Sequence, residues 1–246
     1  MKPGTWRQAI VWIAALATLA LTVRLGLWQL DRAAQKTAAQ EARLQQMRTA
    51  PLSASDLPTT AEQARAAEHR SAVLKGRWLG LHTIYLDNRP MAARAGFHVL
   101  TPLALDDGRL LLVQRGWWPR DVVDRSRVGA PPAPEGVVQV LGRVALAPSR
   151  LFQLAPETAG PIRQNLDLDA YARETRLKLL PWVLVQLEEA AQPVGDGLLR
   201  QWPEPATDVH KHHGYALQWF ALAALVGLLL IWFQVWRPWR RRAGRT

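Results

Sequence analysis

The stretch "YALQWFALAALVGLLLIWFQVW", Tyr215 to Trp236, decides the class of this protein. It runs for 22 residues without a formal charge. A helix of that length spans about 33 Å, slightly more than the roughly 30 Å hydrocarbon core of a bilayer. Aromatic residues gather at its two ends, Tyr215 and Trp219 at one and Trp232, Trp236 and Trp239 at the other, as is typical of side chains at membrane surfaces. We therefore predict a transmembrane helix over residues 212–236.

A second apolar segment covers residues 9–30 and is interrupted by charge only at Arg24. Taken alone, it resembles a secretory signal peptide, because Lys2 and Arg7 precede the apolar run. No small-x-small cleavage site follows it, however, and an arginine near the end of a span can extend its guanidinium to the lipid headgroups. We predict an uncleaved transmembrane helix.

The net charge of +11 is concentrated near the ends of the chain. Eight of the 31 basic residues lie in or beside the two apolar segments, whereas all 20 acidic residues lie between them. This distribution indicates membrane topology rather than a nucleic-acid-binding face. Basic residues flank both apolar segments on their terminal sides, so residues 1–8 and 237–246 are predicted to be cytoplasmic. Residues 31–211 are then predicted to form a domain on the outer side.

This outer domain has the sequence pattern of a sheet with helices at its margins. Residues 30–48 are rich in good helix formers, and Thr60 with Gln63 predicts a capping box for a short helix through His69. Short runs of β-branched, aromatic and leucine residues then predict strands, namely "SAVLKGRWL", "HTIYLDNRP", "GFHVLTPLAL", "RLLLVQRGWW", "GVVQVLGRVAL" and "WVLVQLEE". A hairpin is expected at Asp107-Gly108 and a helix near Asp167. The predicted fold class is an α+β membrane protein with two transmembrane helices flanking a mainly antiparallel, barrel-like domain.

Residue chemistry argues against an enzyme. The chain has no cysteine, which excludes disulfides, thiolate catalysis and cysteine zinc sites. It also lacks the G-x-S-x-G, H-E-x-x-H and P-loop patterns. We expect no catalytic residues.

Three histidines at the start of the second span form the best candidate site. On a helix, His210 and His213 lie about 60° apart and His212 faces elsewhere, while Lys211 repels a cation. A metal site made by all three is therefore disfavoured. A single imidazole as an axial ligand of haem iron needs only one of them, and the alternative is that the histidines are merely hydrated by lipid headgroups.

A second candidate combines arginine and aromatic side chains. The stretches "NRPMAARAGFHVL" and "LLVQRGWWPRD" carry Arg89, Arg94, Arg115, His98, Trp117 and Trp118. Such residues can hold a planar anionic ligand through ion pairs and stacking. The second stretch is equally typical of a strand end followed by a turn at Gly116 and Pro119, so both interpretations stay open for Arg115.

Four stretches together resemble the surfeit locus protein family of cytochrome c oxidase assembly factors. They are "LGLWQLDRAAQK" (residues 25–36), "GFHVLTPL" (96–103), "LLVQRGWWPRD" (111–121) and "HHGYALQWFALA" (212–223). The resemblance implies a bacterial inner-membrane protein with both termini cytoplasmic and a large periplasmic domain. It also implies a non-enzymatic role in oxidase maturation, in which haem a is bound or delivered to the large subunit. Membrane lipid, this subunit and the haem a biosynthesis proteins are the implied partners.

The resemblance also points to individual residues. The recurrent histidine of the family corresponds to His212, the expected haem iron ligand, with His213 as an accessory residue. The family's Trp-Gln pair corresponds to Trp28 and Gln29, and the neighbouring Tyr215 and Trp219 are expected to shield the macrocycle from water. The family often has a tryptophan shortly after an Arg and Asn element, and the segment "PIRQNLDLDAYARET" lacks it. Two rival interpretations are a docking protein that carries no haem and a membrane-anchored periplasmic enzyme.

The predicted topology is testable with reporter fusions. Alkaline phosphatase folds to an active form only outside the cytoplasm, so a fusion near Gly136 should be active. A fusion after Arg242 should be inactive. The reverse pattern of activity would contradict the charge argument and the periplasmic assignment of the domain.

Overall fold

The computed structural model describes residues 3–121, 123–124, 128–152, 160–188, 195–202, 208–237 and 240. The chain forms two compact units, one made of Met1–Ala42 with Pro205–Thr246 and the other of Arg43–Glu204. Lys2, Trp239 and most of the basic tail, which carry part of the topology prediction, lie outside the described residues.

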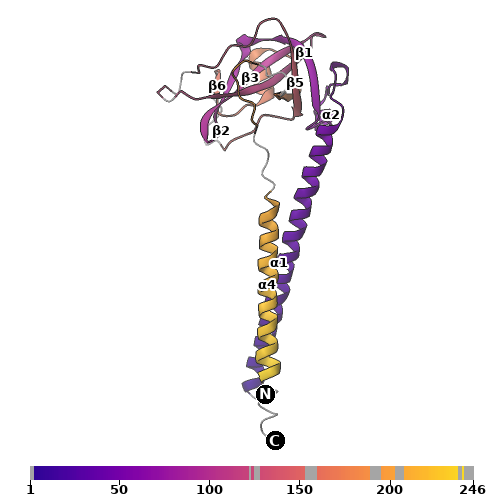
Figure 1. Ribbon diagram of the computed structural model, residues 1–246, viewed down its shortest axis with the longest axis vertical. Helices are drawn as coiled ribbons and strands as arrows, with labels where there is room; N and C mark the ends of the chain where they lie inside the picture. The colour runs from indigo at the N-terminus through magenta and orange to yellow at the C-terminus, as the bar shows by residue number, and fades with distance from the viewer. Residues whose placement is uncertain are drawn as a thin grey trace. The chain divides into compact units, whose positions relative to one another are not determined.

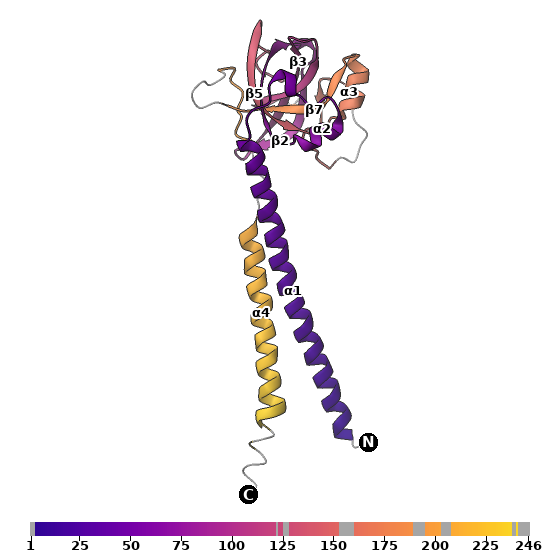
Figure 2. The ribbon, with the colours of Figure 1, turned by 90° about the vertical axis from the view of Figure 1, so that its right-hand side faces the viewer.

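The first unit is a pair of apolar helices (Figures 1 and 2). Helix α1 (Pro3–Arg48) is continuous, and α4 (Val209–Leu230) extends through a π-helical turn, η3 (Ile231–Trp236). Both are long and apolar enough to span a membrane, yet only 11% of the most apolar window of each is buried by protein. A soluble protein would cover such surfaces, so lipid is their solvent and the predicted membrane class is confirmed.

The second unit contains seven strands in a curled sheet (Figure 1). They are β1 (Ser71–Trp78), β2 (Ile84–Met91), β3 (Arg94–Leu105), β4 (Leu110–Pro119), β5 (Val137–Ala145), β6 (Ile162–Arg163) and β7 (Leu179–Gln186). The strand order is β1-β5-β7-β4-β3-β2-β6, and β1 also pairs with β3. Five strands therefore close on themselves, which confirms the barrel-like domain. Closure removes the free edges that an open sheet would expose.

Alternating burial along the strands produces the core. In β1, for example, Ala72 and Leu74 are fully buried while Lys75 is exposed, the period of two that a strand with one solvated face requires. The largest cluster places these residues around Trp182 of β7, whose side chain is fully buried. The hairpin between β3 and β4 turns at Gly108, whose φ of +84° suits glycine, as the sequence predicted.

Two of the sheet pairings were not anticipated from sequence. Strand β4 pairs with β7 in parallel, and β2 pairs with β6 in parallel, whereas the other pairings are antiparallel. The prediction of a mainly antiparallel sheet is confirmed. The β4–β7 pairing is possible because the connection between the two strands is long enough to bring the chain back to the end of the sheet at which β4 begins.

The marginal helices follow their capping residues. Helix α2 (Ala61–Ala66) begins at Thr60, and the predicted capping box with Gln63 is present, although the helix ends before His69. Helix α3 (Leu168–Thr175) begins at Asp167, whose carboxylate accepts from the backbone N–H of Ala170 at 2.9 Å. Short 3-10 turns, η1 (Ala54–Asp56) and η2 (Gly80–His82), complete the domain.

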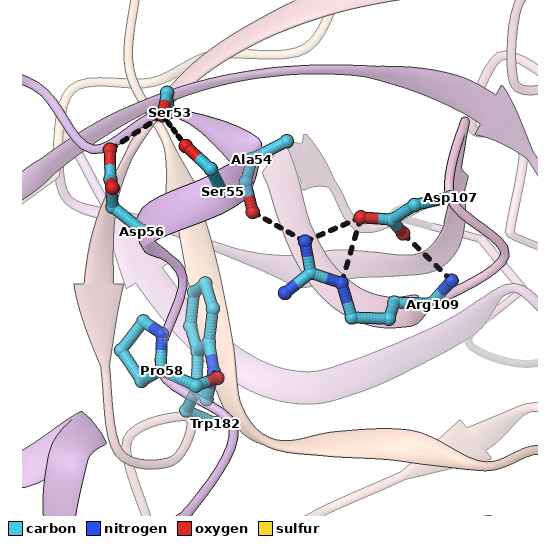
Figure 3. A network of polar contacts seen from close by, with 8 residues as sticks. All are labelled: Ser53, Ala54, Ser55, Asp56, Pro58, Asp107, Arg109 and Trp182. Atoms are coloured by element: carbon cyan, nitrogen blue, oxygen red, sulfur yellow. Dashed lines mark hydrogen bonds and ion pairs between the residues drawn. The ribbon is translucent and has the colours of Figure 1, made fainter.

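Side chains of the sheet attach the segment that leads into the domain (Figure 3). The indole N–H of Trp182 donates to the carbonyl of Pro58 at 2.8 Å, and Arg109 donates to the carbonyl of Ala54. Asp107 orients Arg109, accepting from its Nε at 2.9 Å. The segment around η1 is thus held by β7 and by the β3–β4 hairpin.

Close strand packing around Gly76 generates a stability prediction. A Cβ atom at Gly76 would lie 2.3 Å from the backbone oxygen of Ala104, and backbone atoms cannot move aside cheaply. Gly76→Ala should destabilise the domain by about 1–3 kcal/mol or more. Denaturant unfolding of the purified protein in detergent, followed by tryptophan fluorescence, measures this change.

The matched control is Gly80→Ala. The exposed Gly80 offers an added Cβ only an ordinary 3.7 Å contact with Ala133, so this variant should unfold like the parent protein. Equal stability of the two variants would contradict the close β1–β3 contact.

Candidate functional site

The contact between α1 and α4 follows one face of each helix. On α1, the most buried positions are Thr22, Gly26 and Ala33, and Gln29 between them is half-buried. Their spacing of three and four residues is that of a continuous helix face. On α4, Ala216 and Ala223 are buried in the same unit. The two contact faces thus consist largely of small side chains.

At Gly26 the small residue of α1 receives an aromatic ring of α4. A Cβ added at Gly26 would lie 2.7 Å from the ring of Phe220, so the aromatic ring packs directly on the α1 backbone. Helices in lipid associate through such close van der Waals packing because lipid is as apolar as their side chains. The approach at Gly26 brings the polar residues of the next helical turn within reach of each other.

One hydrogen bond joins the two helices at this turn. His212 Nδ1 lies 2.7 Å from Gln29 Oε1. With the amide oxygen of Gln29 facing the ring, this bond is made by the His212 tautomer that carries its proton on Nδ1 and donates it. No hydrogen bond from the described part of the chain reaches Nε2, the other ring nitrogen, of the partly exposed His212.

The other predicted helix residues surround this pair. Tyr215 is 51% exposed and Trp28, which precedes Gln29, is 56% exposed. His213 is exposed and Trp219 is partly buried. The structure therefore brings His212 together with Gln29, and it leaves large aromatic surfaces nearby available for an apolar ligand.

The histidines at the start of α4 suit a ligand that needs only one side chain of the protein. Among the described residues there is no group of three His, Asp or Glu side chains close enough to hold a metal ion. Within that part of the chain, the three histidines form no polydentate cluster. A neutral imidazole nitrogen is a competent single axial ligand for haem iron.

Arg115 lies inside the second unit and not on a surface. Its side chain is 1% exposed and pairs with Asp196 at 3.1 Å. Asp196 also accepts two hydrogen bonds from Nη2 of Arg200, at 2.8 and 2.7 Å. Burial lowers the pKa of Arg115, while Asp196 opposes the shift. The "QRGWW" stretch thus has a structural role in which the Arg115 guanidinium belongs to a buried ion network. The predicted turn at Gly116 is wrong, because β4 continues to Pro119 and Gly116 pairs with Val99 of β3.

The neighbouring Arg89 and His98 are also buried within the domain. Arg89 is buried and donates to the carbonyl of Gln164 at 2.7 Å, and its own carbonyl accepts from the indole of Trp117 at 2.7 Å. Burial, reinforced by the charge of Arg89, lowers the pKa of His98 to about 3, so His98 is neutral at physiological pH. Arg94, in contrast, is exposed at the start of β3. The structure does not gather the three arginines around one surface.

Comparison with known proteins assigns the family. The family model described as SURF1 family matches residues 16–224, which cover α1 from residue 16, the whole described domain and α4 as far as residue 224. The chain belongs to the SURF1 family. A SURF1-like protein of Rickettsia bellii is 25% identical over 217 residues, covering 86% of each chain. An uncharacterized SURF1-like protein of Mycobacterium bovis is 28% identical over 242 residues, covering 93% of this chain and 83% of its own.

The segment that departs from the usual SURF1 pattern is integrated into the domain. Arg163 donates to both carboxylate oxygens of Glu174 at 2.7 Å. Asn165 clamps the backbone of Leu151, accepting from its N–H at 2.8 Å and donating to its carbonyl at 2.9 Å. Burial raises the pKa of Tyr171 to about 12, so this phenol stays protonated and donates to the carbonyl of His82. These contacts give the Arg and Asn element a structural role without the missing tryptophan.

Two contributors to these sites escaped the sequence reasoning. The resemblance pointed to Gln29 only as part of a Trp-Gln pair, and its contact with His212 spans 183 positions. Asp196 was not predicted as a functional or structural residue, although its spacing of four residues from Arg200 is a local signal of an ion pair. Nothing in the sequence connects Asp196 to Arg115.

Asp196 is predicted to carry much of the domain's electrostatic stability. Asp196→Asn leaves two nearly buried guanidinium groups, Arg115 and Arg200, without their carboxylate. The expected loss is about 3–5 kcal/mol of unfolding free energy, because an unpaired buried charge keeps its desolvation cost. Asp107→Asn is the control, since its ion pair with Arg109 is much more accessible to solvent, with side chains 42% and 28% exposed, and should cost clearly less. Equal effects in denaturant unfolding would contradict a stabilising role for the buried network.

Proposed function

We propose that this SURF1 protein is a non-enzymatic assembly factor of haem-copper cytochrome c oxidase that holds haem a on His212 and passes it to the large subunit. The proposal rests on one observation, the 2.7 Å bond between His212 Nδ1 and Gln29 Oε1. This bond orients the imidazole of His212, one of three histidines at the start of an apolar helix. Membership of a family of oxidase assembly factors supports the rest.

The residues of the helix pair fit a tetrapyrrole. Haem a is the cargo in this proposal, and its iron needs an axial ligand. His212 supplies that ligand through Nε2, the nitrogen that Gln29 leaves free. Trp28 and Tyr215 offer exposed aromatic faces, and with Trp219 they exclude water from an apolar macrocycle. His213 serves as an accessory donor next to His212.

Arg115 takes no direct part in this site. Its guanidinium is nearly inaccessible and is paired with Asp196 inside the domain. We therefore assign Arg115 a role in stabilising the domain, and we assign the contacts with haem to the helix pair.

The domain between the helices is proposed to face the periplasm and to contact the oxidase subunit or the haem a biosynthesis proteins. The charge distribution along the sequence supports this orientation. The absence of nucleophile and base patterns in the sequence supports a function without catalysis. Attachment of the cargo through a single protein ligand also suits a carrier, which must release its cargo.

Haem content tests the role of His212. The full-length protein is co-expressed with a haem a pathway, purified in detergent and examined by absorption spectroscopy. His212→Ala, and more strongly His212→Ala combined with His213→Ala, should lower haem content by more than about tenfold, because the axial ligand is lost. Membrane insertion should be unchanged, since the apolar helix remains.

The control is His210→Ala, which alters an exposed histidine about 160° away from His212 around the helix. It should retain haem. Full haem content and normal oxidase maturation in the double variant would contradict the proposal. A parent protein that supports oxidase maturation without any haem absorption band would favour the docking protein that carries no haem.

A further inference from the structure

The inference concerns the nitrogen atom that His212 presents, and it rests on the proposed function. A neutral imidazole has two tautomers, and only the unprotonated nitrogen has a lone pair for a metal. In water the two tautomers interconvert freely. A fixed hydrogen bond at one nitrogen therefore decides which nitrogen can act as a ligand.

We propose that Gln29 is a positioning residue that holds His212 in the tautomer protonated at Nδ1 and thereby makes Nε2 the ligand nitrogen. The contact that carries this is the 2.7 Å approach of Gln29 Oε1 to Nδ1. With Oε1 facing the ring, the bond forms only when the proton is on Nδ1; a Gln29 amide turned by 180° would donate to Nδ1 and leave the proton on Nε2, and the tautomer measurement distinguishes the two. Nε2 then points away from α1, on the far side of the ring from the glutamine.

The packing of the helix pair places Gln29 for this task. Gly26 lies one turn before Gln29, and Phe220 lies two turns after His212, so the close contact at Gly26 sets the distance between the two helices. Ala33, one turn beyond Gln29, is 1% exposed. Gly26 and Ala33 are buried on either side of Gln29 along α1. This packing fixes the backbone position of Gln29 and limits the rotamers that reach His212.

The membrane environment favours the bond. Polar side chains of membrane helices pair across the helix interface because lipid offers them no other hydrogen-bond partner. Residues that orient metal-binding histidines typically change metal affinity about 10–100-fold when they are altered. The expected effect of Gln29 falls in that range.

The tautomer is measured first, without haem. The full-length protein is labelled with 15N-histidine in detergent micelles, and the signals of His212 are assigned by their loss in His212→Ala. At mildly alkaline pH, the parent protein should show a protonated Nδ1 and an unprotonated Nε2. Gln29→Leu should shift His212 towards a mixture of tautomers. Gln29→Asn should act likewise, because its amide is one methylene too short to reach.

Two further variants separate positioning from general damage. Gln29→Glu keeps an acceptor at the same length and should keep the proton on Nδ1. Gln218→Leu removes an exposed glutamine from α4 and should leave the tautomer unchanged. An unchanged tautomer in Gln29→Leu, or a parent protein protonated at Nε2, overturns the proposal.

Haem binding is measured second, by titrating the same purified proteins with ferric protoporphyrin IX. Gln29→Leu and Gln29→Asn should weaken binding about 10–100-fold, whereas Gln29→Glu and Gln218→Leu should bind like the parent. A changed tautomer with unchanged affinity overturns the positioning role. A parent protein that binds no haem defeats the proposed function instead, and the spectra of His212 then still decide whether Gln29 holds its tautomer.

Discussion

Lipid as a solvent imposes the constraint on which the structure depends. The apolar windows of α1 and α4 are almost uncovered by protein, so these helices are stable only within a bilayer. Once there, they can associate only through close packing and polar pairing. Gly26 provides the packing and the pair of Gln29 with His212 provides the polar contact. The candidate site is thus a consequence of how two membrane helices recognise each other.

The barrel domain is constrained by its buried charged groups. Its closed sheet contains buried charged groups that need partners from within, and Asp196 serves both Arg115 and Arg200. Arg89 and His98 are likewise buried, the first bound to a backbone carbonyl and the second kept neutral by its surroundings. Because these groups serve stability, the haem chemistry proposed for this SURF1 protein falls to the helix pair.

Sequence reasoning succeeded where the signal was local. Thr60 with Gln63, Asp167 and Gly108 each specify a cap or a turn through contacts within a few residues, and the physics of such contacts does not depend on the rest of the chain. It was less successful with Arg115. Arginine beside tryptophan in a sequence looks the same whether the side chain faces a ligand or a buried aspartate 81 positions away.

The sequence alone determined the two spans, the strand-forming segments, the family resemblance and His212 as the residue of interest. Hydropathy, alternation and motifs depend only on residues that are close together in the chain. The tertiary structure decided which strands close the barrel, with β1 reaching β3 and β4 lying parallel to β7. It also decided that Asp196 neutralises Arg115 and that Gln29 contacts His212. These contacts join residues far apart in the chain, and their free energy comes from packing and desolvation that exist only after folding, so no local pattern encodes them.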